Sequence, residues 1–196
     1  MYLTKLQLSL QKEYDISCLQ DCEKMHKRVL RLFQTDRVSG RILYRVNPAE
    51  QAVYIRSQVP PDTAYTKGER IHTKSLDRME AQLLMSPYLR FELLTMPFTS
   101  HTNEGYRNKL RVPITSPDGM MAWLMRKGSQ HGFHLQQIRI GGQTLITGMH
   151  RVGPLAFAAV HFSGVLEVTD KQQFMEAWQG GIGTGRAYGM GMLLVR

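Results

Sequence analysis

Alternation of apolar and polar residues marks the first strand of this chain. From Tyr2 to Leu10, every second residue after Lys5 is leucine, and the residues between the leucines are polar. This period of two is typical of a strand with one buried face. From Leu19 to Phe33 the apolar residues instead recur every three or four positions, which predicts a helix with one apolar stripe. His26 lies on that stripe.

Two short strands are expected next, over Arg41 to Val46 and Ala52 to Ser57. The five residues between them include Asn47 and Pro48, which favour a hairpin turn. Residues 60–85 are polar at first and then weakly helical. The order strand, helix, strand, strand, helix is that of a ferredoxin-like half, although its fourth strand has no clear place in the sequence.

The same order recurs in the second half of the chain. Ser116 followed by Pro117 is typical of a helix start, and Thr169 with Asp170 is a second such start. Gly141 and Gly142 predict a turn that makes an added hairpin. The expected segments are a strand at 89–93, a helix at 117–127, strands at 133–140, 144–149 and 155–168, a helix with Phe174 and Trp178, and a last strand at 192–195.

These patterns predict an α+β chain with two tandem ferredoxin-like (RRM-like) domains. Each domain is expected to hold an antiparallel sheet with helices on one face. We place the N-terminal domain at residues 1–86 and the C-terminal domain at residues 87–196. The length of 196 residues fits two small domains.

Charge indicates a polyanionic partner. The chain has 25 Lys and Arg against 16 Asp and Glu, a formal net charge of +9. Such an excess attracts phosphates over long distances. No stretch approaches the roughly 20 apolar residues that cross a bilayer, and Lys5 and Lys12 interrupt the start where a signal peptide would have an apolar core. We therefore expect a cytoplasmic protein without membrane partners.

Six glycines lie between Gly180 and Gly191, around Arg186. Bare backbone amides beside a cation can bind phosphate oxygens. A dinucleotide fingerprint is excluded because it requires a helix and a further strand after the glycines, and a P-loop is excluded because it requires Gly-Lys-Ser/Thr at a helix start. The alternative is that the glycines allow tight packing of the last helix on the sheet.

Cys18, Cys22 and His26 recur every four residues, as metal ligands on one helix face would. Three ligands on consecutive turns span about 12 Å of helix axis, which is too long for one ion. We therefore expect neither a metal nor another cofactor. Two cysteines also give no disulfide framework, in agreement with a reducing compartment.

The chain resembles the CasE-type CRISPR repeat endoribonucleases of the RAMP superfamily, which are the RNA-processing subunits of the Cascade complex. The glycine-rich loop is the most specific motif: two Gly-hydrophobic-Gly triplets flank a basic residue. The matching segments run through nearly the whole chain, namely Met1 to Lys5, Met25-His26, Arg111 to Pro113, Ala122 to Leu124, Phe162 to Leu166, and Gly181 to Gly191 with Arg186.

This resemblance implies cleavage of a CRISPR repeat stem-loop without a metal ion. The ribose 2′-OH would attack the adjacent phosphorus and leave a 2′,3′-cyclic phosphate, and the enzyme would remain on the hairpin. His26 matches the catalytic histidine of the family. The family carries a tyrosine three residues earlier, where this chain has Glu23. Glu23 adjoins His26 on a helix, so it could hold the imidazolium, accept the proton, or simply pair with Lys27.

Several basic residues are candidate RNA contacts. We expect the hairpin to touch a basic helix face, a basic run that matches the RNA-binding segment of the family, and the glycine-rich loop. These residues are Lys24, Lys27, Arg28 and Arg31; Arg107, Lys109 and Arg111; and Gly181, Gly183, Gly185, Arg186, Gly189 and Gly191. The implied partners are CRISPR repeat RNA and other Cascade subunits, with a monomer when alone. The alternative function is a RAMP-like subunit that binds crRNA without cutting it.

Overall fold

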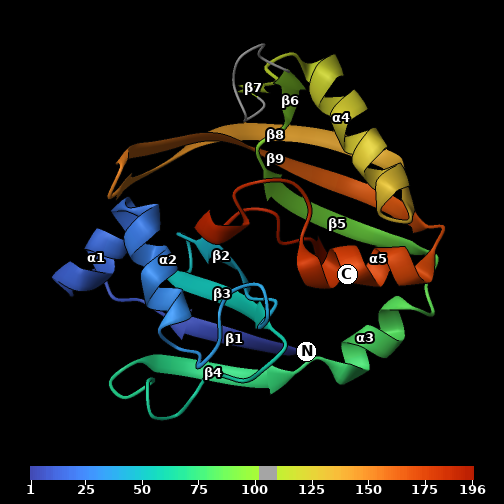
Figure 1. Cartoon of the computed structure of the whole chain (residues 1–196). Helices are drawn as coiled ribbons and strands as arrows, with labels where there is room; N and C mark the ends of the chain where they lie inside the picture. Colours follow the sequence, from blue (N-terminus) through green and yellow to red (C-terminus); the bar gives the residue numbers. More distant parts are fainter. Residues whose placement is uncertain (102–109) are drawn as a thin grey trace.

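The N-terminal half of the chain forms a four-stranded antiparallel sheet with its helices on one face. A computed structural model describes residues 1–101 and 110–196 (Figure 1). The strands lie in the order β2-β3-β1-β4. Apolar residues of α2, among them Met25 and Val29, pack with residues of the sheet such as Leu6 in one buried cluster. The elements are β1 (Tyr2–Gln7), α1 (Glu13–Gln20), α2 (Cys22–Leu30), β2 (Leu43–Asn47), β3 (Ala52–Ser57) and β4 (Arg70–Ser75).

The C-terminal half repeats this arrangement with a second sheet in the order β10-β5-β9-β8. If the four strands of each sheet are numbered in the order in which they occur in the chain, both sheets have the strand order 4-1-3-2. β6 and β7 form a separate two-stranded pair and are not counted. Trp123 of α4 and Phe174 of α5 lie in one buried cluster with Phe91 of β5. The helix α3 (Asp77–Leu83) precedes this half in the chain. The elements of the half are β5 (Tyr88–Thr95), β6 (Phe98–His101), β7 (Leu110–Pro113), α4 (Pro117–Gln130), β8 (Phe133–His150), β9 (Gly153–Val168), α5 (Lys171–Gly180), the 3-10 turn η1 (Arg186–Tyr188) and β10 (Leu194–Val195).

The predicted tandem ferredoxin-like fold of class α+β is therefore confirmed. Two separate apolar clusters accompany the two sheets. The boundary between residues 86 and 87 stays a prediction. Within the described residues, no helix is both long and apolar enough to cross a lipid bilayer.

The helix predicted over Leu19 to Phe33 is wrong in one respect, because it is two helices. Asp21 adopts an extended backbone (φ −135°, ψ 109°), which ends α1. Its carboxylate then accepts hydrogen bonds from the backbone amides of Glu23 (2.9 Å) and Lys24 (3.1 Å) at the start of α2. A residue that prefers to cap a helix thus divides a continuous apolar pattern.

The turn predicted at Gly141 and Gly142 is also wrong. β8 runs from Phe133 to His150 without a break, and these glycines lie at a shift of register between Ile140 and Gln143. A bulge of this kind bends a strand without ending it. The long β8–β9 hairpin therefore extends past its own sheet and over α1 and α2 (Figure 1).

The unplaced fourth strand of the first half is β4, within the segment expected to be polar and then helical. β4 pairs with β1 over six residues, from Tyr2 opposite Ser75 to Gln7 opposite Arg70. Its residues are mostly exposed, so they lack the apolar alternation by which a strand is recognised. The helix α3 follows β4 and does not precede it.

Candidate active site

His26 lies in the middle of α2, half-buried between this helix and the glycine-rich loop. The neighbouring Met25 and Val29 are fully buried in the N-terminal core, which fixes the rotation of the helix. The start of α2 is held by Asp21, whose carboxylate also lies 3.4 Å from the backbone amide of Met149 on β8. The imidazole is thus carried by an element that is anchored at its start and along its buried face.

The glycine-rich loop brings η1 against His26. The ring of Tyr188 lies edge-on to the imidazole, with 5.7 Å between ring centroids and an angle of 66°. On its other side, Tyr188 stacks on Phe157 of β9 at 5.1 Å. The backbone carbonyl of Ala187 accepts a hydrogen bond from the Tyr44 hydroxyl (2.9 Å). Segments far apart in the sequence therefore enclose the imidazole.

Burial is the main cause that lowers the pKa of His26 below its ordinary value. Glu23 and a hydrogen bond to the Ala187 backbone act in the opposite direction, while Arg37 and Lys27 lower the pKa further through charge repulsion. The imidazole is therefore neutral at pH 7 and available to accept a proton.

Glu23 is buried and directly engaged with its neighbours. Its carboxylate lies 3.2 Å from the Lys27 ammonium, as predicted for residues four apart on a helix. It also hydrogen bonds to the side chain of Tyr188, and burial together with the charge of Glu23 raises the pKa of Tyr188. Glu23 is thus not a solvated surface charge, because it links α2 to η1 next to His26.

Two cations, Arg37 and Lys27, act on the imidazole. Arg37 is close enough to lower the pKa of His26. The pKa of Arg37 is itself lowered, mainly by burial and secondly by the positive charge of Arg186. Lys24, Lys27 and Arg31 are exposed on or just after α2. Like charges held together around a neutral histidine favour the binding of an anion such as a phosphate group.

Arg28 corrects the predicted basic helix face. Its guanidinium is buried and lies 2.8 Å from both Asp15 and Glu69. It also lies over the ring of Tyr14. Because these protein groups occupy Arg28, it joins the helices to the loop before β4 and is left out of the RNA contacts that we propose.

The glycines of the loop are placed where side chains would collide. A Cβ at Gly191 would lie 2.8 Å from the carbonyl oxygen of Ile182, and Gly191 has φ +79°. A Cβ at Gly183 would lie 2.4 Å from the hydroxyl of Thr95, and one at Gly185 would lie 2.1 Å from Met190. Gly181 and Gly189 are buried with positive φ. Packing thus accounts for this glycine pattern, and a contact with RNA stays a prediction.

Arg186 is tied to the same loop. Its guanidinium donates a hydrogen bond to the carbonyl of Gly180 (2.9 Å), while its aliphatic stem lies against Gly181 and Gly191. The side chain remains exposed. A rigid, exposed guanidinium can still bind a phosphate with its remaining N–H groups.

The basic run of the second half is only partly described. Arg107 and Lys109 lie outside the described residues. Arg111 is exposed on β7, and its guanidinium lies 5.2 Å from the centre of the Phe98 ring. The β6–β7 hairpin therefore presents at least one cation away from the second sheet.

The structure separates Cys18 from the other two residues of the metal-like pattern, because it lies on α1. Among the residues that the structure describes, no group of three His, Cys, Asp or Glu side chains is arranged to hold a metal ion. Cys22 is buried, and burial raises the pKa of its thiol to about 11.

Sequence reasoning missed three groups next to His26: Arg37, the carbonyl of Ala187 and the ring of Tyr188. Arg37 precedes β2 in a turn with no recognisable motif, so the sequence carries no sign of its position. Tyr188 does lie inside the glycine-rich motif. An aromatic residue among glycines is an anchor for a loop, and that observation could have singled it out.

Comparison with known proteins shows the family to which this chain is related. The sequence profile of the family described as CRISPR associated protein matches residues 1–196. The CRISPR-associated endoribonuclease Cse3 of Thermus thermophilus is 26% identical over 213 residues, which cover 100% of this chain and 99% of the relative.

Two solved structures share the fold over the full length. A structure of the endoribonuclease Cse3 bound to a 19-nucleotide RNA has a TM-score of 0.83 at 25% identity and is covered over 100% of both chains. Thermus thermophilus Cse3 bound to an RNA that represents a pre-cleavage complex has a TM-score of 0.81 at 26% identity, over 100% of this chain and 98% of that chain.

Proposed function

The chain belongs to the CRISPR associated protein family, and from that premise we propose that it is an endoribonuclease that processes CRISPR transcripts. Its substrate would be the stem-loop of the repeat, and its partners would be the bound RNA hairpin and other Cascade subunits. We expect a cytoplasmic monomer outside that complex. The observation that carries the proposal is a neutral, enclosed histidine within a group of cations, in a chain similar to an endoribonuclease.

The reaction that we propose is attack by the ribose 2′-OH on the adjacent phosphorus, without a metal ion. His26 would accept the hydroxyl proton, and its lowered pKa keeps the imidazole in the form that can do so. A proton must also reach the departing 5′-oxygen. The products would be a 2′,3′-cyclic phosphate and a free 5′-hydroxyl.

The cations have a separate role in this mechanism. The phosphorane that forms during attack carries more negative charge than the starting phosphodiester. Lys27, Arg37 and Arg186 lie where they would stabilise that charge before and during the reaction. Tyr188 and Glu23 would hold the imidazole in place between α2 and η1.

Cleavage of the repeat hairpin in excess EDTA tests this function. We expect wild type to cut the all-ribose RNA, and His26→Ala to lose about 10²- to 10⁴-fold in rate, as for one acid-base group. An RNA with a single 2′-deoxy sugar at the cut should resist wild type. His134→Ala removes an exposed histidine on β8 and serves as the matched control.

Other outcomes contradict the proposal. Full activity of His26→Ala would exclude His26 as the proton acceptor. Tight binding of the hairpin by wild type with no cleavage would favour the alternative, a subunit that holds crRNA without cutting it.

A further inference from the structure

The second sheet has a polar face that α4 and α5 do not cover. Along β5, Leu89, Phe91 and Leu93 are buried beneath these helices. Arg90 and Glu92 alternate with them and so point to the opposite face. Across the sheet, Glu92 pairs with Ser163 of β9, which in turn pairs with Arg139 of β8.

Positive charge is concentrated on this open face. Arg90 and Arg139 are exposed, and so is Arg196 next to β10. The backbones of Arg90 and Arg196 exchange hydrogen bonds of 2.9 and 3.0 Å, so the two residues lie directly opposite each other. Like charges in directly opposite positions destabilise a sheet. This arrangement concentrates positive charge at one edge of the face, which suits an anionic ligand.

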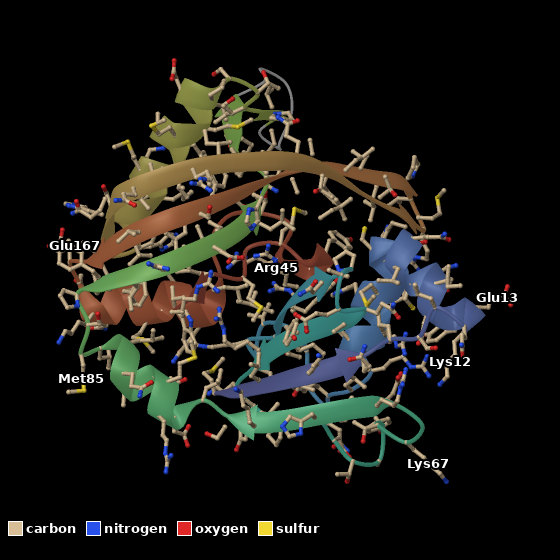
Figure 2. All side chains as sticks on the ribbon, turned by 180° about the vertical axis from the view of Figure 1, so that it is seen from behind. Lys12, Glu13, Arg45, Lys67, Met85 and Glu167 are labelled. Atoms are coloured by element: carbon tan, nitrogen blue, oxygen red, sulfur yellow. The ribbon has the colours of Figure 1, made fainter. Side chains whose placement is uncertain are left out.

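Glu92 holds several of these cations together. Its carboxylate oxygens lie 3.2 Å from the Arg196 guanidinium, 3.6 Å from the His161 imidazole and 4.0 Å from the Arg45 guanidinium. Arg45 comes from β2 of the other sheet, and Figure 2 places it between the two sheets. Among the described residues, its buried Nη1 has no hydrogen-bond partner. Because the single carboxylate of Glu92 faces more than one arginine, the cluster as a whole keeps a net positive charge.

The open face is hollowed, and its cavity shares a lining residue with a neighbouring cleft. A cavity of about 660 Å³ is lined by Arg90, Arg139, Arg196 and His161. His161 also lines a neighbouring cleft of about 820 Å³, together with Arg45 and Tyr188. Tyr188 is the residue that contacts His26. The cleft therefore extends from Tyr188, beside the candidate active site, to His161 at the charged face.

We propose that the open face of the second sheet, with Arg45 at its margin, is a second RNA-binding surface that holds a single-stranded stretch joined to the hairpin. This proposal rests on the proposed function for the identity of the hairpin. Guanidinium groups bind phosphates in pairs of hydrogen bonds and stack on bases, so arginine side chains suit an unpaired strand. The sequence of that strand would matter little.

A single strand fits this surface better than a duplex does. The cavity is a hollow in the second sheet, which a single flexible backbone can follow. An A-form helix instead presents its phosphates on a wide convex surface. An acidic protein segment would satisfy the same charges, and the test below separates the two.

The test compares a repeat hairpin with the same hairpin carrying an unpaired oligouridine extension. Binding is measured in a His26→Ala background, so that the RNA stays intact. We expect the extension to tighten binding, and the double variant Arg90→Gln with Arg139→Gln to remove that gain. For two lost phosphate contacts, the slope of log affinity against log salt should fall by about 1.4 with the extended RNA only.

Arg78→Gln is the matched control, because it removes one exposed arginine on α3, which lines neither cavity. The reciprocal variant Glu92→Gln should tighten binding of the extended RNA, since it removes the opposing charge. These measurements report binding and do not depend on cleavage. If wild type failed to cut the hairpin, the proposed function would be contradicted, but the binding test of this surface would remain valid.

Three results would overturn the proposal. In the first, the extension adds no affinity for wild type. In the second, the double variant still binds the extended RNA more tightly than the plain hairpin, which would place the strand elsewhere. In the third, the double variant binds both RNAs as wild type does but no longer associates with the other Cascade subunits. That result would assign the face to a protein partner.

Discussion

At the scale of single residues, the pKa of His26 sets the pH range of the proposed reaction. Burial lowers this pKa, so the acid limb of the rate profile should lie below pH 6.5, near which a free histidine titrates. Glu23 acts in the other direction, because its carboxylate stabilises the imidazolium. The two side chains can therefore be separated by their effects on pH dependence.

We predict that Glu23→Gln shifts the acid limb of kcat/KM to still lower pH. The substitution removes the charge that raises the pKa of His26 and keeps the size of the side chain. The imidazole pKa can be followed directly by NMR titration. If Glu23 itself accepts the 2′-OH proton, the rate will instead fall about 10²- to 10⁴-fold at every pH.

The residues around His26 show why a site is harder to predict than a fold. His26 itself was identified only through a resemblance, since a histidine on an apolar stripe is usually a packed one. Arg37 and Ala187 reach it through loops whose paths depend on contacts between distant segments. Arg28 shows the reverse error, because its charge looked exposed in the helix pattern and is enclosed by Asp15 and Glu69.

At the scale of elements, periodicity predicted most strands and helices, and the errors occur where one residue overrides the pattern. Asp21 divides a helix by capping its second part. The pair Gly141 and Gly142 suggested a turn, but pairing of β8 with β9 continues on both sides and a bulge absorbs the irregularity. β4 was missed because an exposed edge strand needs no apolar alternation.

The glycine-rich loop yields a prediction at this scale. Gly191→Ala should destabilise the protein by more than about 1 kcal/mol, since it forces a side chain into a positive φ and against the carbonyl of Ile182. Gly142→Ala is the matched control, because nothing lies within 4 Å of its Cβ position. Urea denaturation measures both. Equal stability of the two variants would contradict the view that packing requires these glycines.

At the scale of the whole molecule, Arg56 joins the two halves. It projects from β3 and is fully buried, and its guanidinium donates hydrogen bonds to the carbonyls of Leu193 (3.0 Å) and Trp178. It also lies 4.2 Å over the Trp178 ring. Burial lowers the pKa of Arg56 to about 9, which still leaves it charged at pH 7.

We predict that Arg56→Met lowers the free energy of unfolding by about 2–4 kcal/mol, because it leaves two buried carbonyls without their donors. Arg56→Lys should be nearly as unstable as Arg56→Met, since a single ammonium group cannot reproduce the forked hydrogen bonds of the guanidinium. Arg78→Met on exposed α3 should change stability by less than about 0.5 kcal/mol. Denaturant titration measures the free energy of unfolding of each variant. If Arg56→Met unfolds at the same denaturant concentration as wild type, apolar packing alone holds the two halves together.

The contact between His26 and Tyr188 has a consequence for biosynthesis. The two residues are 162 positions apart, and a ribosome that adds 5–20 residues per second needs roughly 8–30 seconds to make the second after the first. During that interval the nascent chain already displays the histidine but lacks the ring and carbonyl that enclose it. The proposed site is therefore incomplete until the late segment has been translated and has folded back onto α2.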